Sequence, residues 1–134
     1  MKQKRISTIT LIALILIAAV VVGVSLYLIS GRKTGGINLG LEDNGKIIDV
    51  GMGTIVVIKL PENPSTGYAW RYSVNGNIAE VMENFYIPPE NQIEGRGGTR
   101  MLKLRVIGSG EFAMDYVRPW ENQPISHFSV TFRV

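Results

Sequence analysis

Cysteine is absent from the 134-residue sequence, and histidine occurs once, at His127. Without cysteine there can be no disulfide, no thiolate nucleophile and no Cys-ligated metal site. With one histidine and no Glu-x-x-His spacing, neither a catalytic triad nor a metal centre can readily be assembled. Carboxylate pairs such as Glu80 and Glu83 fall in a segment expected at the surface, where they are solvated. We therefore expect no enzyme activity and no cofactor.

The sequence also lacks a basic surface that could bind nucleic acid. The formal net charge is +3, but Lys2, Lys4, Arg5, Arg32 and Lys33 supply five of the fourteen basic residues. Beyond residue 33, nine Lys or Arg face eleven Asp or Glu, which gives a net charge of −2. Because a phosphate backbone is bound through clustered basic residues, no nucleic-acid partner is expected.

Charged residues are missing from residues 6–30, a run of 25 positions dominated by Ile, Leu, Val and Ala. A transmembrane helix needs about 20 apolar residues, so the run predicts an uncleaved signal-anchor. More basic residues precede the run than follow it, which places residues 1–5 in the cytoplasm. The prediction is a single-pass, membrane-anchored protein with an extracytoplasmic domain. Cleavage at Gly23-Val24-Ser25, the one tolerable signal-peptidase site, would instead give a secreted protein.

A glycine-rich linker at residues 31–44 and a domain at residues 45–134 are expected after the anchor. In the domain, apolar residues alternate with polar ones in short runs separated by Gly, Pro and Asn. About seven strands are predicted, at residues 47–50, 54–60, 68–74, 78–86, 101–106, 111–116 and 128–134. This spacing is typical of an all-β, immunoglobulin-like antiparallel β-sandwich, here preceded by one transmembrane helix. Trp70, on the third strand, is expected in the core.

Three loops of unusual composition interrupt these strands. The first contains Asn63, Pro64, Ser65, Thr66, Gly67 and Tyr68. Pro64 fixes φ and Gly67 can take positive φ, so the loop should be ordered, although alone it could be an ordinary turn. The second contains Gly95, Arg96, Gly97 and Gly98, and its glycines permit close backbone approach. A strand follows it, and a phosphate site would need a helix there.

The third loop contains Arg118, Pro119 and Trp120. An exposed Trp beside an Arg is the composition enriched in binding hot spots. Trp120 could equally fold back onto the core as a lid, and the sequence leaves both possibilities open. In an immunoglobulin-like strand order, all three loops emerge at the same end of the sandwich, which would make that end a binding edge.

The three motifs, Asn-Pro-Ser-Thr-Gly-Tyr, Gly-Arg-Gly-Gly and Arg-Pro-Trp, occur in the order found in a known family. Together they closely resemble the loops N-P-T-T-G-[YF], G-x-G-G and R-P-[WFY] of the chagasin-type inhibitors of papain-like cysteine peptidases. Ser65 stands where the commonest pattern has Thr. The resemblance extends to residues 86–89 and 112–117, and it covers about residues 45–134.

The resemblance implies an immunoglobulin-like domain whose three loops form a wedge in the active-site cleft of a papain-like peptidase. The first loop would lie over the enzyme's catalytic residues, with Thr66 closest. The second would lie along the non-primed side, and Trp120 of the third would stack on an aromatic surface of the primed side. Inhibition would be reversible and non-covalent, by a monomer. The alternative is a membrane-tethered adhesion or assembly module, which would have no reason to require all three motifs.

Overall fold

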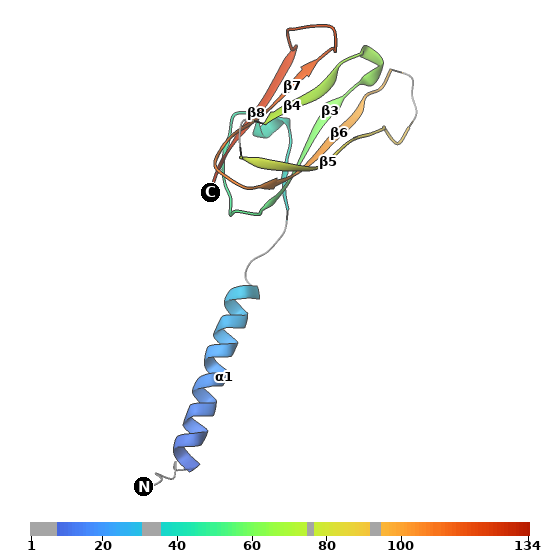
Figure 1. The fold of residues 1–134 in the computed structure, drawn as a ribbon. Helices are drawn as coiled ribbons and strands as arrows, with labels where there is room; N and C mark the ends of the chain where they lie inside the picture. The colour runs from blue at the N-terminus through green and yellow to red at the C-terminus, as the bar shows by residue number, and fades with distance from the viewer. Residues whose placement is uncertain (1–7, 31–35, 75–76, 92–94) are drawn as a thin grey trace. The chain divides into compact units, whose positions relative to one another are not determined.

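The computed structural model describes residues 8–30, 36–74, 77–91 and 95–134. The chain divides into two compact units, Met1–Thr34 and Gly35–Val134. The first unit contains helix α1 (Thr8–Ser30), and the second contains every described strand (Figure 1).

The membrane predictions for the N-terminal segment are wrong. Within the described ranges, the structure has no helix that is both long and apolar enough to cross a membrane. This finding overturns the transmembrane helix at residues 6–30, the signal-anchor, the membrane as a partner and the membrane-anchored, extracytoplasmic location. The prediction rested on an uncharged run in which Ile, Leu, Val and Ala dominate, but that run also contains polar or small residues such as Ser7, Thr10 and Gly23. Absence of charge is therefore a weaker criterion than the apolarity of the helix itself.

The second unit is a sandwich of two four-stranded sheets, ordered β1-β3-β6-β5 and β2-β8-β7-β4. This order corresponds to the ABED and GFC sheets of immunoglobulin-like domains. The strands of the first sheet are β1 (Ile37–Leu39), β3 (Ile55–Glu62), β6 (Gly98–Val106) and β5 (Ala79–Ile87). Those of the second are β2 (Ile47–Asp49), β8 (Ser126–Arg133), β7 (Gly110–Val117) and β4 (Ala69–Val74). Two short 3-10 helices accompany them, η1 (Leu41–Asp43) and η2 (Pro64–Thr66).

Two details of the sandwich differ from the sequence-based expectation. Strand β1 and helix η1 lie within residues 31–44, which were expected to be a linker. In addition, β1 pairs in parallel with β3, and β2 pairs in parallel with β8, so the sheets are not purely antiparallel. Strand β1 is only three residues long, too short to show a period of two, although its last residue, Leu39, is buried.

The core lies between the sheets and follows the alternation of the strands. On β3 and β6 the inward residues are Val56, Ile58, Leu60, Leu102, Leu104 and Val106, each at most 1% exposed. Across from them, Phe112, Met114, Phe128, Val130 and Phe132 are equally buried. A fully buried side chain of this kind contributes about 1.5 to 3 kcal/mol to stability. Trp70 is buried and stacks on Tyr116, with ring centroids 5.0 Å apart, which confirms its expected place in the core.

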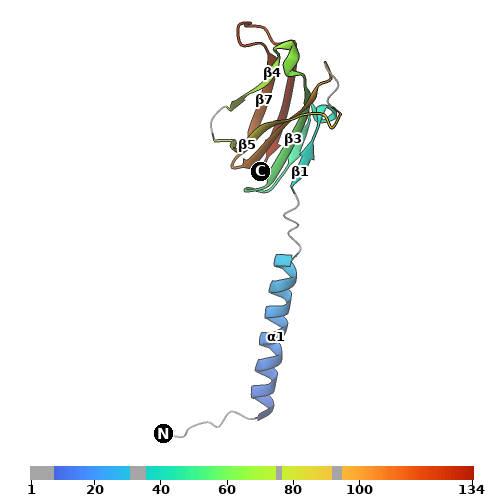
Figure 2. The ribbon, with the colours of Figure 1, turned by 90° about the vertical axis from the view of Figure 1, so that its right-hand side faces the viewer.

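The connections that follow β3 and β7 lie at one end of the sandwich, and the C-terminus lies toward the other end (Figures 1 and 2). Antiparallel strands place these connections together, because β3, β5 and β7 all run toward that end. The fold therefore presents the loop regions before β4, β6 and β8 side by side.

Candidate functional site: a three-loop edge

The first loop is held in shape by its own side chains. Asn63 caps η2, accepting hydrogen bonds at Oδ1 from the Ser65 backbone N–H at 3.3 Å and from Ser65 Oγ at 2.6 Å. The Thr66 hydroxyl donates to the Asn63 carbonyl at 2.7 Å. Pro64 begins the 3-10 helix, and Gly67 ends it in the left-handed region at φ 81°. The loop is thus a closed turn with exposed Pro64, Ser65 and Thr66 side chains.

A buried ion pair lies directly beneath this loop. Glu62, 2% exposed, accepts hydrogen bonds at Oε2 from the Trp70 backbone N–H at 2.9 Å and from Arg100 Nε at 3.0 Å. Arg100 Nη2 donates to the other carboxylate oxygen. The Trp70 indole N–H donates to the Pro61 carbonyl at 2.8 Å. Because three donors converge on the carboxylate, the buried charge is compensated, and the strands on both sides of the loop are joined.

The sequence reasoning missed this pair, although a signal was present. Glu62 continues the inward positions of β3, and Arg100 precedes the inward positions of β6. A charged residue at an inward-facing strand position requires a partner of opposite charge, because an unpaired buried charge is costly. The alternation of inward and outward positions could therefore have identified Glu62 and Arg100 as a pair from the sequence.

The second loop contacts the first through backbone groups. The Asn63 amide Nδ2 donates to the Gly95 carbonyl at 2.9 Å. A Cβ atom on Gly97 would lie 2.8 Å from the Glu62 carbonyl oxygen, and one on Gly98 would lie 2.1 Å from the Ile87 carbonyl oxygen. These two positions exclude any side chain, whereas Arg96, between Gly95 and Gly97, is exposed. The glycines therefore allow the two loops to touch.

The third loop contacts the first from the opposite side. Arg118 Nε donates to the Thr66 carbonyl at 3.0 Å, and Arg118 Nη1 donates to Glu121 at 3.1 Å. The Arg118 guanidinium carbon lies 4.3 Å from the centroid of the Tyr68 ring. Trp120 is 72% exposed, and Pro119 beside it is exposed too. Trp120 is therefore not a lid over the core.

Two tyrosines connect the loop edge to the sandwich. The Asn63 backbone N–H donates to the Tyr116 hydroxyl at 2.9 Å. The Tyr116 ring lies between Trp70 and Tyr68, with centroid distances of 5.0 Å and 5.5 Å. All thirteen residues singled out in the three motifs are consequently near this edge, and the first loop lies in the middle.

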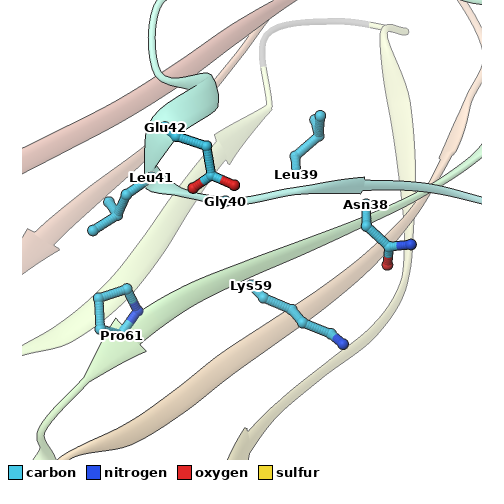
Figure 3. Close-up of a pocket in the computed structure, with 7 residues that line it drawn as sticks. All are labelled: Asn38, Leu39, Gly40, Leu41, Glu42, Lys59 and Pro61. Atoms are coloured by element: carbon cyan, nitrogen blue, oxygen red, sulfur yellow. The ribbon is translucent and has the colours of Figure 1, made fainter.

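Outside the three loops, the described surface carries an exposed histidine and a hollow beside β1 and β3. No group of three or more His, Cys, Asp and Glu residues is placed to hold a metal ion in the part of the chain that the structure describes. His127 Nδ1 lies 2.6 Å from Asp115 on exposed positions of neighbouring strands. A hollow of about 390 Å³ lies outside β1 and β3, with Leu41 and Pro61 at one end and Asn38 and Lys59 at the other (Figure 3). None of its lining residues belongs to the three loops.

Comparison with known proteins shows the family of the chain. The family model described as Chagasin family peptidase inhibitor I42 matches residues 49–132. Chagasin of Trypanosoma cruzi is 38% identical over 99 residues, which cover 68% of this chain and 87% of chagasin.

Two solved structures share the fold of the second unit. The crystal structure of the cysteine protease inhibitor EhICP2 from Entamoeba histolytica matches with a TM-score of 0.64 at 19% identity, covering 73% of this chain and 94% of that one. The solution structure of Amebosin matches with a TM-score of 0.61 at 26% identity, covering 74% of this chain and 97% of that one. The chain belongs to the chagasin family of peptidase inhibitors, because the family model matches more than half of the sequence and the chain is 38% identical to chagasin.

Proposed function

We propose that this protein inhibits papain-like cysteine peptidases reversibly by inserting its three-loop edge into the active-site cleft. The observation that carries the proposal is the contact of the first loop with both others, through Asn63 to Gly95 and through Thr66 to Arg118. Three separate motifs thereby form one continuous surface. The contact residues proposed are Asn63, Pro64, Ser65, Thr66, Gly67, Tyr68, Gly95, Arg96, Gly97, Gly98, Arg118, Pro119 and Trp120.

Each loop has its own part in this proposal. The central first loop covers the peptidase's catalytic residues, and Thr66 makes the closest approach because it lies at the exposed end of η2. The second loop offers backbone groups to the non-primed side, where its glycines permit close approach. Trp120 stacks on the primed side, since a large exposed aromatic ring buries much area at low entropic cost.

The rigidity of the edge suits inhibition better than cleavage. Ordering a flexible side chain at an interface costs about 0.5 to 1.5 kcal/mol, and internal hydrogen bonds avoid much of that cost. The first loop is a 3-10 turn, not an extended strand, so its peptide bonds are not presented in the near-attack geometry that hydrolysis needs. The peptidase would therefore bind the loop without cutting it, and no covalent step is needed.

Titration of the protein against papain tests this function. We expect the activity of papain to fall to zero near a one-to-one ratio of inhibitor to enzyme and to return on dilution. The inhibitor should keep its full mass after prolonged contact with the enzyme. Competition with substrate should be complete, because both occupy one cleft. Full peptidase activity at micromolar inhibitor, or progressive cleavage of the first loop, would contradict the proposal. Adhesion or assembly has no comparable observation in its favour.

A further inference from the structure

We infer that Arg118 is a positioning residue, which fixes the third loop against the first, and not primarily a contact to the peptidase. The inference rests on the proposed function, because it concerns how the inhibitory edge is held ready. The geometry around the guanidinium carries it, since this group meets partners from its own chain on several sides.

The hydrogen bonds of Arg118 are made inside the protein. Nε donates to the Thr66 carbonyl at 3.0 Å, in the middle of the first loop. Nη1 donates to Glu121 at 3.1 Å, and the Glu121 backbone N–H donates back to the Arg118 carbonyl at 3.1 Å. The two hydrogen bonds between Arg118 and Glu121 close the turn around Pro119 and Trp120. One side chain thus shapes the third loop and ties it to the first.

The flat face of the guanidinium is also occupied. Its central carbon lies 4.3 Å from the Tyr68 ring centroid and 6.0 Å from that of Trp120, within the range of cation–π attraction. Trp120 in turn reaches Gly67, where an added Cβ would lie 3.1 Å from Trp120 Cη2. The exposed indole is therefore held over the end of the first loop by Arg118 on one side and Gly67 on the other.

Only arginine meets these demands together. Its planar group can donate in two directions and stack at the same time, whereas the lysine ammonium is a point charge on a flexible stem. The Arg118 side chain is 33% exposed, so a peptidase could reach it, but using its engaged donors would break contacts with Thr66 and Glu121. We therefore assign its main effect to preorganisation of Thr66 and Trp120.

Amide hydrogen exchange in the free protein, combined with inhibition of papain, tests this assignment. The variants are Arg118→Lys, Tyr68→Leu and the double variant. The matched control is Arg105→Lys, because Arg105 also pairs with a carboxylate, Glu80, but lies on exposed positions away from the three loops. Thermal unfolding of each variant shows whether the domain remains folded.

In the free protein, Arg118→Lys should accelerate exchange at the Thr66 and Gly67 amides, which bond to Asn63 and Pro64 carbonyls at 3.2 and 3.0 Å. The same variant should weaken inhibition about tenfold or more, through the ordering cost that reappears on binding. Tyr68→Leu should weaken inhibition too, and the double variant should add little to either single change, because the residues act as one unit. Arg105→Lys should change neither readout.

Two results would overturn the assignment. One is weakened inhibition with unchanged exchange at Thr66 and Gly67, which would make contact with the peptidase the main role of Arg118. The other is full additivity of Arg118→Lys and Tyr68→Leu. If the unaltered protein fails to inhibit papain, the proposed function fails instead, and the exchange measurement still decides whether Arg118 holds the two loops together.

Discussion

At the scale of single residues, Trp120 is the large apolar side chain that the third loop exposes, at 72%. Replacement by alanine removes stacking area from the proposed interface and nothing from the core. We expect Trp120→Ala to weaken peptidase binding by about 2 kcal/mol or more, as for a hot-spot aromatic residue. The midpoint of thermal unfolding should stay almost unchanged. Inhibition constants and calorimetry check both, and loss of folding would show that Trp120 supports the domain.

Gly67 allows a second test at this scale because the chain offers a matched control. Gly67 and Gly53 both have φ 81°, but an added Cβ meets Trp120 at 3.1 Å only at Gly67, with nothing within 4 Å at Gly53. Alanine at either position should lower the free energy of unfolding by about 1 to 2 kcal/mol, because a residue with a Cβ is strained in the left-handed conformation. Only Gly67→Ala should also weaken inhibition, since it displaces Trp120. Equal inhibition by the two variants would disprove the role of that contact.

At the scale of secondary-structure elements, Glu62 joins β3 to β4 and β6 beneath the first loop. Glu62→Ala would leave Arg100 without its buried partner and the Trp70 N–H without an acceptor. We expect a loss of about 3 kcal/mol in the free energy of unfolding, measured by chemical denaturation. Glu80→Ala, which removes an exposed partner of Arg105, should cost at most about 1 kcal/mol. Similar losses for the two variants would contradict the structural role of the buried pair.

The parallel pairing of β2 with β8 predicts a pH dependence. Arg133 Nη2 donates to Asp49 Oδ2 at 2.9 Å, and this hydrogen bonding lowers the pKa of the Asp49 carboxyl. A lowered pKa stabilises the folded state above the ordinary value of about 3.9, and the contribution is lost as the pH falls through the folded-state pKa. Carboxyl NMR titration should show this low pKa, and Arg133→Gln should raise it toward the ordinary value. An unchanged Asp49 pKa in that variant would show that Arg133 is not the cause of the lowered pKa.

At the scale of the whole molecule, the sequence predicted the sandwich better than its connections. Six of the seven predicted strands were found because alternation of inward residues, as from Val56 to Leu60, extends over several positions, whereas β2 is only three residues long. Strand β1 was missed because its three residues show no period and lie among the glycines that predicted a linker. The contacts of Arg118 and of Glu62 depend on which strands become neighbours, and that is set by the fold as a whole. The membrane helix was wrongly predicted because an uncharged run rich in Ile, Leu, Val and Ala does not by itself establish a helix long and apolar enough to cross a membrane.

Occupation of the peptidase cleft by the three-loop edge is the central claim, and it can be tested by binding. Calorimetric titration would compare papain with a free active site and papain whose cleft is filled by a small covalent inhibitor. We predict tight one-to-one binding to the free enzyme and a loss of at least about a hundredfold in affinity for the filled one. Equal affinity for both forms would show that the loops bind elsewhere and would contradict the account.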